Sequence, residues 1–423
     1  MAVDDGDGTG RAPAGDLAVA PAGGPSGPPG ELVAWREWCR GLGALGEGLI
    51  DGRPPRRGPA AAEALEHLAD QVLCWLGWSV LHADPGRPAF HRQNDLITQW
   101  GGPNNDNVYR HARVSPGRRY RIRGRMHACE NFILAVRAGF MHRAQWGTLV
   151  EVTASDRGIG PGDDFELLVG GERADELGPG SVPLPPGALM VSIREYYFDW
   201  RAEEPAVFTI ECLDADAEPR PALTGATLTT RLDEALSQVG DSLSYWTRYQ
   251  DEHRAARADN SFAASERVTK GLAAARYAFC FFDLAPDEVL AVETDVPDAR
   301  YWSLQLYNLD WFEPIDPAGR ISSLNHRQTV VDPDGRVRVA VGATDPGTPN
   351  WLDTGGRAEG MLTLRWFWPA SDRVPAPGAT VVRLGAGRTG WPSGWNDVGV
   401  VTGSERAAVA AARRRHLAWR FRT

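Results

Sequence analysis

The stretch "GGPNNDNVYRHARV", residues 101–114, gathers many hydrogen-bonding side chains where a turn-like run meets a strand-like run. A carboxylate beside amides at the mouth of a strand can act as a general base, a metal ligand or an acceptor for a hydroxyl group. The competing interpretation is turn chemistry, because Asn and Asp side chains bond to nearby backbone groups. The side chains that could do chemistry here are Asn104, Asn105, Asp106, Tyr109, Arg110 and His111.

Strand alternation is expected to point Tyr109 and His111 to the same face. Together with Asn105 and Asp106 they are more polar groups than one turn requires. We therefore predict that these four residues contribute to the rim or wall of the main pocket. In this hypothesis Asp106 and His111 do the acid–base chemistry. The candidate ligand-binding residues of the stretch are Asn104, Asn105, Tyr109 and Arg110.

A second pattern is the alternation in "RYRIRGRMH", which puts Arg121, Arg123 and Arg125 on one face of a strand. The short link "SPGRR" predicts a hairpin with the strand at residues 108–114. Guanidinium groups on one sheet face repel each other unless they meet water, carboxylates or an anionic ligand. Three interpretations stay open: a solvated face, an anion pocket in which Arg123 binds the ligand, and pairing with later acidic residues. Those acidic residues are Glu195, Asp199, Glu203 and Glu204.

Tryptophan-rich strands in the C-terminal half supply further candidates. Trp302 and Trp351 could line a cavity for a flat or apolar ligand, or they could pack between two sheets. Arg365 lies inside the apolar run "LTLRWFWP". If it points inward, its buried guanidinium needs a partner. We count Trp302, Trp351 and Arg365 as ligand-binding candidates.

Metal and cofactor motifs are missing from the sequence. The five cysteines form no Cys-x-x-Cys pair, and neither His-x-His nor His-Glu-x-x-His occurs. We therefore predict no metal and no cofactor, with a set of His111, His127 and Glu130 as the alternative. No Gly-x-Ser-x-Gly nucleophile elbow occurs either.

Composition restricts the class of protein. The net charge of −10 disfavours a nucleic-acid binder. No window approaches the ~18 apolar residues of a membrane span. The first thirty residues lack the basic start and apolar centre of a signal peptide. The sequence therefore predicts a soluble, cytoplasmic protein whose partner is a small molecule, and it leaves a homo-oligomer open.

Hydrophobic periodicity predicts the elements that must position these residues. A 3.6-residue period predicts helices near residues 31–78, 228–256 and 404–420, and a period of two predicts strands over 108–213 and 270–385. The expected fold is mostly β (α+β). The expected parts are a disordered tail (1–30), a helical N-terminal segment (31–100), a first β domain (101–215), a helical linker (216–260) and a second β domain with a C-terminal helix (261–423).

Three motifs of the C-terminal half resemble the domain-of-unknown-function family numbered 1214. They are "DARYWSLQLYN", "NWLDTGG" and "LTLRWFWP". "PNNDNVY" resembles the Pro-Asn-x-Asp-x-x-Tyr motif of the partner family numbered 1254, although Asn107 stands where that family usually has Thr. The resemblance implies two jelly-roll-like β domains joined by helices, and it implies no activity.

Two functional hypotheses remain. The first is an enzyme that acts on a small, partly apolar and anionic metabolite in a polar-rimmed pocket, with Arg110 and Arg123 binding charge. The alternative is a non-catalytic protein that binds a small molecule or a carbohydrate through the same rim. A closed pocket that brings Asp106 to a histidine or a second carboxylate would favour the enzyme.

Overall fold

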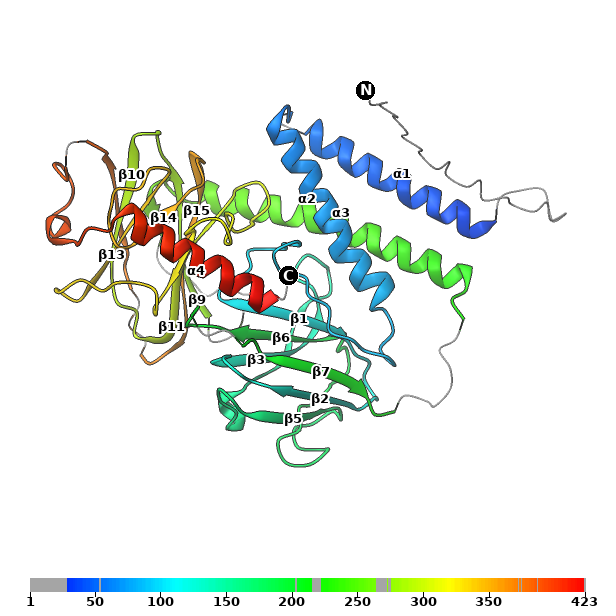
Figure 1. The fold of residues 1–423 in the computed structure, drawn as a ribbon. Coiled ribbons are helices and arrows are strands. Elements are labelled where there is room, and N and C mark those ends of the chain that lie inside the picture. Colours follow the sequence, from blue (N-terminus) through cyan, green and yellow to red (C-terminus); the bar gives the residue numbers. More distant parts are fainter. Residues whose placement is uncertain are drawn as a thin grey trace, which may run out of the picture.

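The structure is a computed structural model that describes residues 29–52, 55–201, 204–214, 222–263, 272, 275–371, 373, 375–385 and 387–421. The tail predicted at the N-terminus falls almost entirely outside the described residues. The described chain is mostly β with four long helices, so the predicted α+β fold class is confirmed. Figure 1 shows the strands gathered in two β regions, with the long helices packed beside and across them.

The long helices are α1 (Gly30–Ile50), α2 (Pro59–Leu76), α3 (Gly225–Ala255) and α4 (Gly403–Phe421). A π-helical turn, η1 (Gly77–Leu81), extends α2, and η2 (Ser155–Arg157) and η3 (Trp395–Asp397) are single 3₁₀ turns. The side chain of Thr224 caps α3 by accepting a hydrogen bond from the Thr227 backbone N–H at 3.2 Å. One stripe of α3 is buried, with Leu232, Val239, Leu243 and Trp246 among its residues, and it packs α3 onto its neighbours.

The first β region is a sandwich of two antiparallel sheets with one shared core. One sheet has the order β1-β6-β3-β4 and the other has the order β5-β2-β7. Side chains from both sheets, among them Val108, Ile122 and Phe132, form a single buried cluster. The strands are β1 (Asn107–Arg113), β2 (Tyr120–Arg125), β3 (Asn131–Gly139), β4 (Gly147–Thr153), β5 (Asp164–Val169), β6 (Met190–Tyr196) and β7 (Val207–Cys212).

The predicted hairpin between the first two strands is wrong. β1 pairs with β6, whereas β2 lies in the other sheet between β5 and β7. The arginine face of β2 meets carboxylates from both neighbours, with Arg123 Nε donating to Glu166 Oε2 at 2.8 Å. The Arg123 side chain is 56% exposed. This face is therefore solvated and ion-paired, with partners other than those the sequence suggested.

The second β region is also a two-sheet sandwich around one core, which contains Leu290, Leu304 and Leu362. Its sheets have the orders β12-β11-β15-β9-β8 and β14-β13-β10-β16, and only the β13–β14 pairing is parallel. The strands are β8 (Ser261–Phe262), β9 (Ala275–Asp283), β10 (Glu288–Asp295), β11 (Ala299–Tyr307), β12 (Ser323–Asn325), β13 (Arg336–Gly342), β14 (Trp351–Asp353), β15 (Glu359–Pro369) and β16 (Gly378–Arg383).

The turn before β1 docks on the outer face of β11. Asn104 Nδ2 donates to the Tyr301 hydroxyl at 2.9 Å, and the Asn105 backbone N–H donates to Gln305 Oε1 at 3.1 Å. The Tyr307 hydroxyl donates to the Pro103 carbonyl at 2.7 Å. Because these three β11 residues alternate with core residues, one face of the strand fills the second sandwich while the other binds the first β region.

Asp106 lies at the centre of this junction and is 1% exposed. Its Oδ1 accepts hydrogen bonds from Trp200 Nε1 at 2.8 Å and Asn325 Nδ2 at 2.7 Å. Its Oδ2 accepts one from the Tyr301 hydroxyl at 2.6 Å. The carboxylate therefore joins the two β regions through three donors.

Helix α4 covers the same junction, and Figure 1 shows it running across both β regions. Arg413 donates to the Ser323 carbonyl at 2.9 Å, and Arg420 donates to the Asn105 carbonyl. Both guanidinium groups lie over the Trp200 ring, at 4.2 Å and 4.8 Å from its centroid. Burial lowers the pKa of each arginine to about 10, and the Asp106 carboxylate opposes this shift.

No helix of the described residues is long and apolar enough to cross a membrane.

Replacing Asp106 with Ala should lower the free energy of unfolding by about 3–5 kcal/mol, because three buried donors lose their acceptor and two buried arginines lose their counter-charge. Urea denaturation monitored by tryptophan fluorescence measures this loss. Asp164→Ala is the matched control, since its ion pair with Arg125 is exposed and should contribute about 0–1 kcal/mol. An equal effect of the two substitutions would show that Asp106 is only a turn residue.

Candidate functional site

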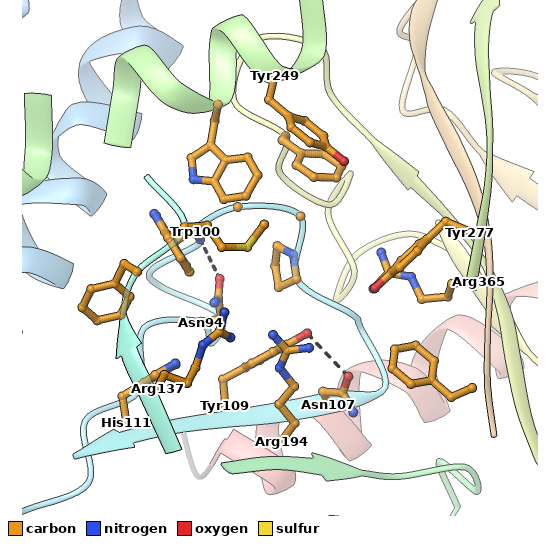
Figure 2. Close-up of a pocket in the computed structure, with 18 of the residues that line it drawn as sticks. Asn94, Trp100, Asn107, Tyr109, His111, Arg137, Arg194, Tyr249, Tyr277 and Arg365 are labelled. Carbon is orange, nitrogen blue, oxygen red and sulfur yellow. Dashed lines mark hydrogen bonds between the residues drawn. The ribbon is translucent and has the colours of Figure 1, made fainter. Parts of the chain in front are cut away.

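A cavity of about 90 Å³ lies between the outer faces of the two β regions, under α3. By volume it has room for roughly six water molecules, and therefore for a small organic molecule. Figure 2 shows its polar side chains converging from both sides. The lining residues come from β1, β3, β6, β9, β15, α3, the loop before β1 and the segments that follow β3 and β11. The polar and charged ones are Asn94, Asn107, Tyr109, His111, Arg137, Arg194, Tyr249, Tyr277 and Arg365.

The alternation of β1 selects which of its side chains reach the cavity. Asn107, Tyr109 and His111 line it. Arg110 takes the opposite face, where it forms a buried ion pair with Glu195. The Tyr109 hydroxyl accepts a hydrogen bond from the Asn104 backbone N–H at 2.8 Å. Tyr109 therefore belongs to both the cavity wall and the junction.

The loop before β1 closes another side of the cavity through two adjacent glycines. Gly101 and Gly102 have φ values of +64° and +62°. A Cβ atom at Gly101 would lie 2.2 Å from the Trp246 ring, and one at Gly102 would lie 2.2 Å from the Phe312 ring. Only glycine combines this backbone conformation with such close approach. The loop therefore packs directly against two rings that line the cavity.

Three guanidinium groups line the cavity and none of them forms an ion pair with a described carboxylate. Arg137 on β3 is 6% exposed, and its Nε has no hydrogen-bond partner. Arg194 on β6 stands over the Tyr109 ring, 5.5 Å from its centroid. Arg365 on β15 is 4% exposed and donates to the Tyr307 hydroxyl.

The negative charge near these groups is small. No Asp or Glu of the described residues lines the cavity. The one carboxylate that raises the pKa of Arg137 is Glu151, on the neighbouring strand β4. Burial and then the Arg194 charge outweigh it and lower the pKa of Arg137 to about 10. Arg137 therefore remains protonated at neutral pH, and the cavity carries excess positive charge.

His111 is the titratable group beside these charges. It is 6% exposed, and its Nδ1 has no partner. Burial, followed by the charges of Arg137, His91 and Arg194, holds its pKa well below the usual 6.5. The imidazole is therefore neutral at neutral pH, and in this state one ring nitrogen can accept a proton.

The structure brings three of the predicted site residues together in this cavity: Tyr109, His111 and Arg365. It places the others elsewhere. Arg110 is ion-paired inside the first sandwich, and Arg123 lies on the exposed face of β2. Trp302 and Trp351 pack in buried clusters of the second sandwich, away from the cavity.

The turn residues that opened the sequence argument serve the junction. Asn104 and Asn105 line a neighbouring space of about 20 Å³, and Asp106 lines neither space. The location predicted for Asn105 and Asp106, in the main pocket wall, is therefore not the one the structure shows. The physical reason is that hydrogen bonds to β11 and α4 hold these two residues at the junction, away from the cavity. The functional roles of all these residues stay predictions.

Sequence reasoning missed two of the three cavity arginines. Arg137 interrupts the apolar run "NFILAVRAG" and Arg194 interrupts "ALMVSIREYYF". That is the same signal that identified Arg365, namely a charge inside a strand that is otherwise core. The contribution of α3, through Trp246 and Tyr249, carried no such signal because aromatic residues on a helix face usually pack in a core.

Among the described residues, no group of three or more His, Cys, Asp or Glu side chains is arranged to hold a metal ion. The three residues considered as an alternative metal set in the sequence do not form one. The charges of Arg137 and Arg194 act on His111, and a cation would have to compete with them.

Comparisons with known proteins show what this fold is similar to. The class defined by the structure is a pair of β sandwiches with a cationic, aromatic cavity between them. A family model described as "Protein of unknown function (DUF1214)" matches residues 282–371, so the resemblance of the C-terminal part is confirmed over that range. No match to a curated protein was found.

Solved structures extend the likeness beyond that segment. The chain is similar to an uncharacterised protein from Burkholderia cenocepacia, with 27% identity and a TM-score of 0.75. That match covers 84% of this chain and 98% of the other. A protein from Vibrio parahaemolyticus matches at 12% identity and a TM-score of 0.41, over 74% of this chain and 96% of the other. The first likeness therefore spans both β regions.

Acidification tests the state of His111. Below about pH 6.5 an unfolded histidine binds a proton that folded His111 does not, so the free energy of unfolding falls as pH decreases. Each such group contributes a slope of about 1.4 kcal/mol per pH unit. Urea unfolding of His111→Gln between about pH 5 and 6.5 should show a weaker dependence of the free energy of unfolding on pH. The slope should be smaller than that of the wild type by this amount.

His91 is the internal reference for this measurement. Its pKa is lowered to about 4, chiefly by burial, so its share of the slope persists in the variant. An identical pH slope in wild type and variant would show that His111 is protonated in the folded protein.

Proposed function

We propose that the cavity binds a small organic anion with an apolar or aromatic body. The observation that carries this proposal is the set of three guanidinium groups, Arg137, Arg194 and Arg365, in a lining without Asp or Glu among the described residues. Burying a charge without a partner costs several kcal/mol. A carboxylate, sulfate or phosphate group on the ligand would offset that cost and could accept paired hydrogen bonds from a guanidinium.

The rest of the lining supports an apolar body on the ligand. The aromatic lining residues are Trp100, Phe140, Trp246, Tyr249, Tyr277, Phe279, Phe312 and Phe367, with Met141 and Met190 beside them. Such rings offer large flat surfaces with few polar contacts. The cavity volume of about 90 Å³ restricts the ligand to a small molecule. A carbohydrate fits less well, because a neutral ligand would leave three positive charges uncompensated.

An enzyme that acts on such an anion is the second candidate, and His111 favours it. A neutral imidazole with an unpartnered Nδ1 could take a proton from a bound ligand once the negative charge of that ligand offsets the arginine charges that lower the pKa of His111. Asp106 supports this chemistry less, since all its contacts serve the junction. Consumption of a bound ligand, followed by NMR and abolished in His111→Gln at unchanged affinity, would favour the enzyme over the binding protein.

The relation of the N-terminal half to family 1254 also stays a proposal. Its support is the motif from Pro103 to Tyr109, which forms the docking turn. A cytoplasmic location and the oligomeric state stay predictions.

Benzoate is the simplest probe of the binding proposal, measured by calorimetry or by tryptophan fluorescence. Arg137→Gln should weaken benzoate binding at least tenfold, or about 1.4 kcal/mol. Its free energy of unfolding should be unchanged or higher, because an uncompensated buried charge is removed. If Arg137 had a structural role, the substitution would instead lower the free energy of unfolding.

Arg123→Gln is the matched control, because it removes an arginine from an exposed strand face that does not line the cavity. It should leave benzoate affinity unchanged. The proposal fails if neither benzoate nor another small aromatic carboxylate binds at millimolar concentration, or if the two variants bind such a probe equally well.

A further inference from the structure

The three cavity arginines stand on two opposite walls. Arg137 and Arg194 come from β3 and β6, on the outer face of the β1-β6-β3-β4 sheet of the first sandwich. Arg365 comes from β15, in the second sandwich. Figure 2 shows Arg137 beside His111 on one side of the cavity, Arg365 beside Tyr277 on the other, and Tyr109 between them.

The two arginines of the first wall act on each other, since the Arg194 charge contributes to the lowered pKa of Arg137. Their side chains share one face of the sheet and line the same cavity, although the register sets them four residues apart, with Arg137 opposite Met190 and Arg194 opposite Ile133. One anionic group between them would relieve their mutual repulsion. This wall therefore forms the first anion-binding end.

Arg365 is held at the second wall and cannot join them without breaking contacts. Its guanidinium donates to the Tyr307 hydroxyl and lies over the rings of Tyr277 and Tyr307, at 5.5 Å and 5.6 Å from their centroids. Tyr307 is itself fixed by its hydrogen bond to the Pro103 carbonyl. An anionic group bound at the first wall would leave the Arg365 charge buried and unpaired.

We propose that the ligand is a dianion with two separated anionic groups, such as a small dicarboxylate with an apolar or aromatic spacer. One group binds between Arg137 and Arg194, the other binds Arg365, and the spacer lies along the Tyr109 ring. This inference rests on the proposed function, which requires only one anionic group. The ligand thus spans the two β regions and compensates charges on both.

The test compares probes that differ only in where their charges lie. Benzoate carries one carboxylate, isophthalate and terephthalate carry two at different separations, and phenyl phosphate carries its charge at one end. At least one dicarboxylate should bind tenfold more tightly than benzoate and phenyl phosphate, as measured by calorimetry on the full chain.

Variants of the second wall assign that advantage to a residue. Arg365→Gln should weaken dicarboxylate binding at least tenfold more than it weakens benzoate binding, so that the advantage of the dicarboxylate is lost. Arg365→Lys keeps the charge and should restore part of the advantage. Arg137→Gln should weaken both probes, because both place a carboxylate at the first wall.

Each other outcome overturns the inference, in distinguishable ways. Equal affinities for benzoate and the dicarboxylates, or tighter binding of phenyl phosphate, would show a single anion-binding end and leave the proposed function standing. Equal weakening of benzoate and dicarboxylate in Arg365→Gln would give Arg365 a structural role. If none of the four probes binds, the proposed function fails as well.

Discussion

The buried carboxylate of Asp106 is the constraint on which the arrangement of this protein depends. A charged group that is 1% exposed must find donors, and these come from Trp200 in the first β region and from Tyr301 and Asn325 in the second. Arg420 brings α4 to the same place. Because losing any of these partners is costly, the two sandwiches and the helix dock in one orientation. The cavity follows from that docking, since it lies where the same two outer faces separate.

Two of the four motifs that carried the family resemblances contact each other directly. The turn from Pro103 to Asn107 supplies one surface, and the polar face of β11 supplies the other. This explains the composition of "RYWSLQLY", in which Tyr301, Ser303 and Gln305 face the turn while Trp302, Leu304 and Leu306 fill the core. Most of the hydrogen-bonding side chains crowded before β1 therefore serve docking. Of the polar side chains in this stretch, those of Asn107, Tyr109 and His111 line the cavity between the β regions.

Local pattern was enough to predict some features, and tertiary contacts decided the others. Periodicity predicted the helices and the strand-rich regions, alternation paired Tyr109 with His111, and a charge inside an apolar run singled out Arg365. Strand partners were not predictable in this way, and β1 pairs with a strand about eighty residues later rather than with β2. The hydrogen-bond partners of Asp106 were equally unpredictable from the sequence, because two of its donors lie 94 and 219 residues away. No spacing rule reports a contact of that kind.

The arginines of the cavity differ from buried arginines elsewhere in the chain in the counter-charges that surround them. Arg338 on β13 is 4% exposed and meets three carboxylates, those of Asp332, Asp334 and Glu293. Arg110 is paired with Glu195 in the first sandwich. Arg338 and Arg110 thus meet carboxylates inside the fold, and the Asp106 charge acts on the buried Arg413 and Arg420. Arg137, Arg194 and Arg365 lack such partners at the one place where they share a cavity with aromatic walls, and they lie on both sides of it. A bound anion is the simplest counter-charge for this arrangement, since it leaves no buried guanidinium uncompensated.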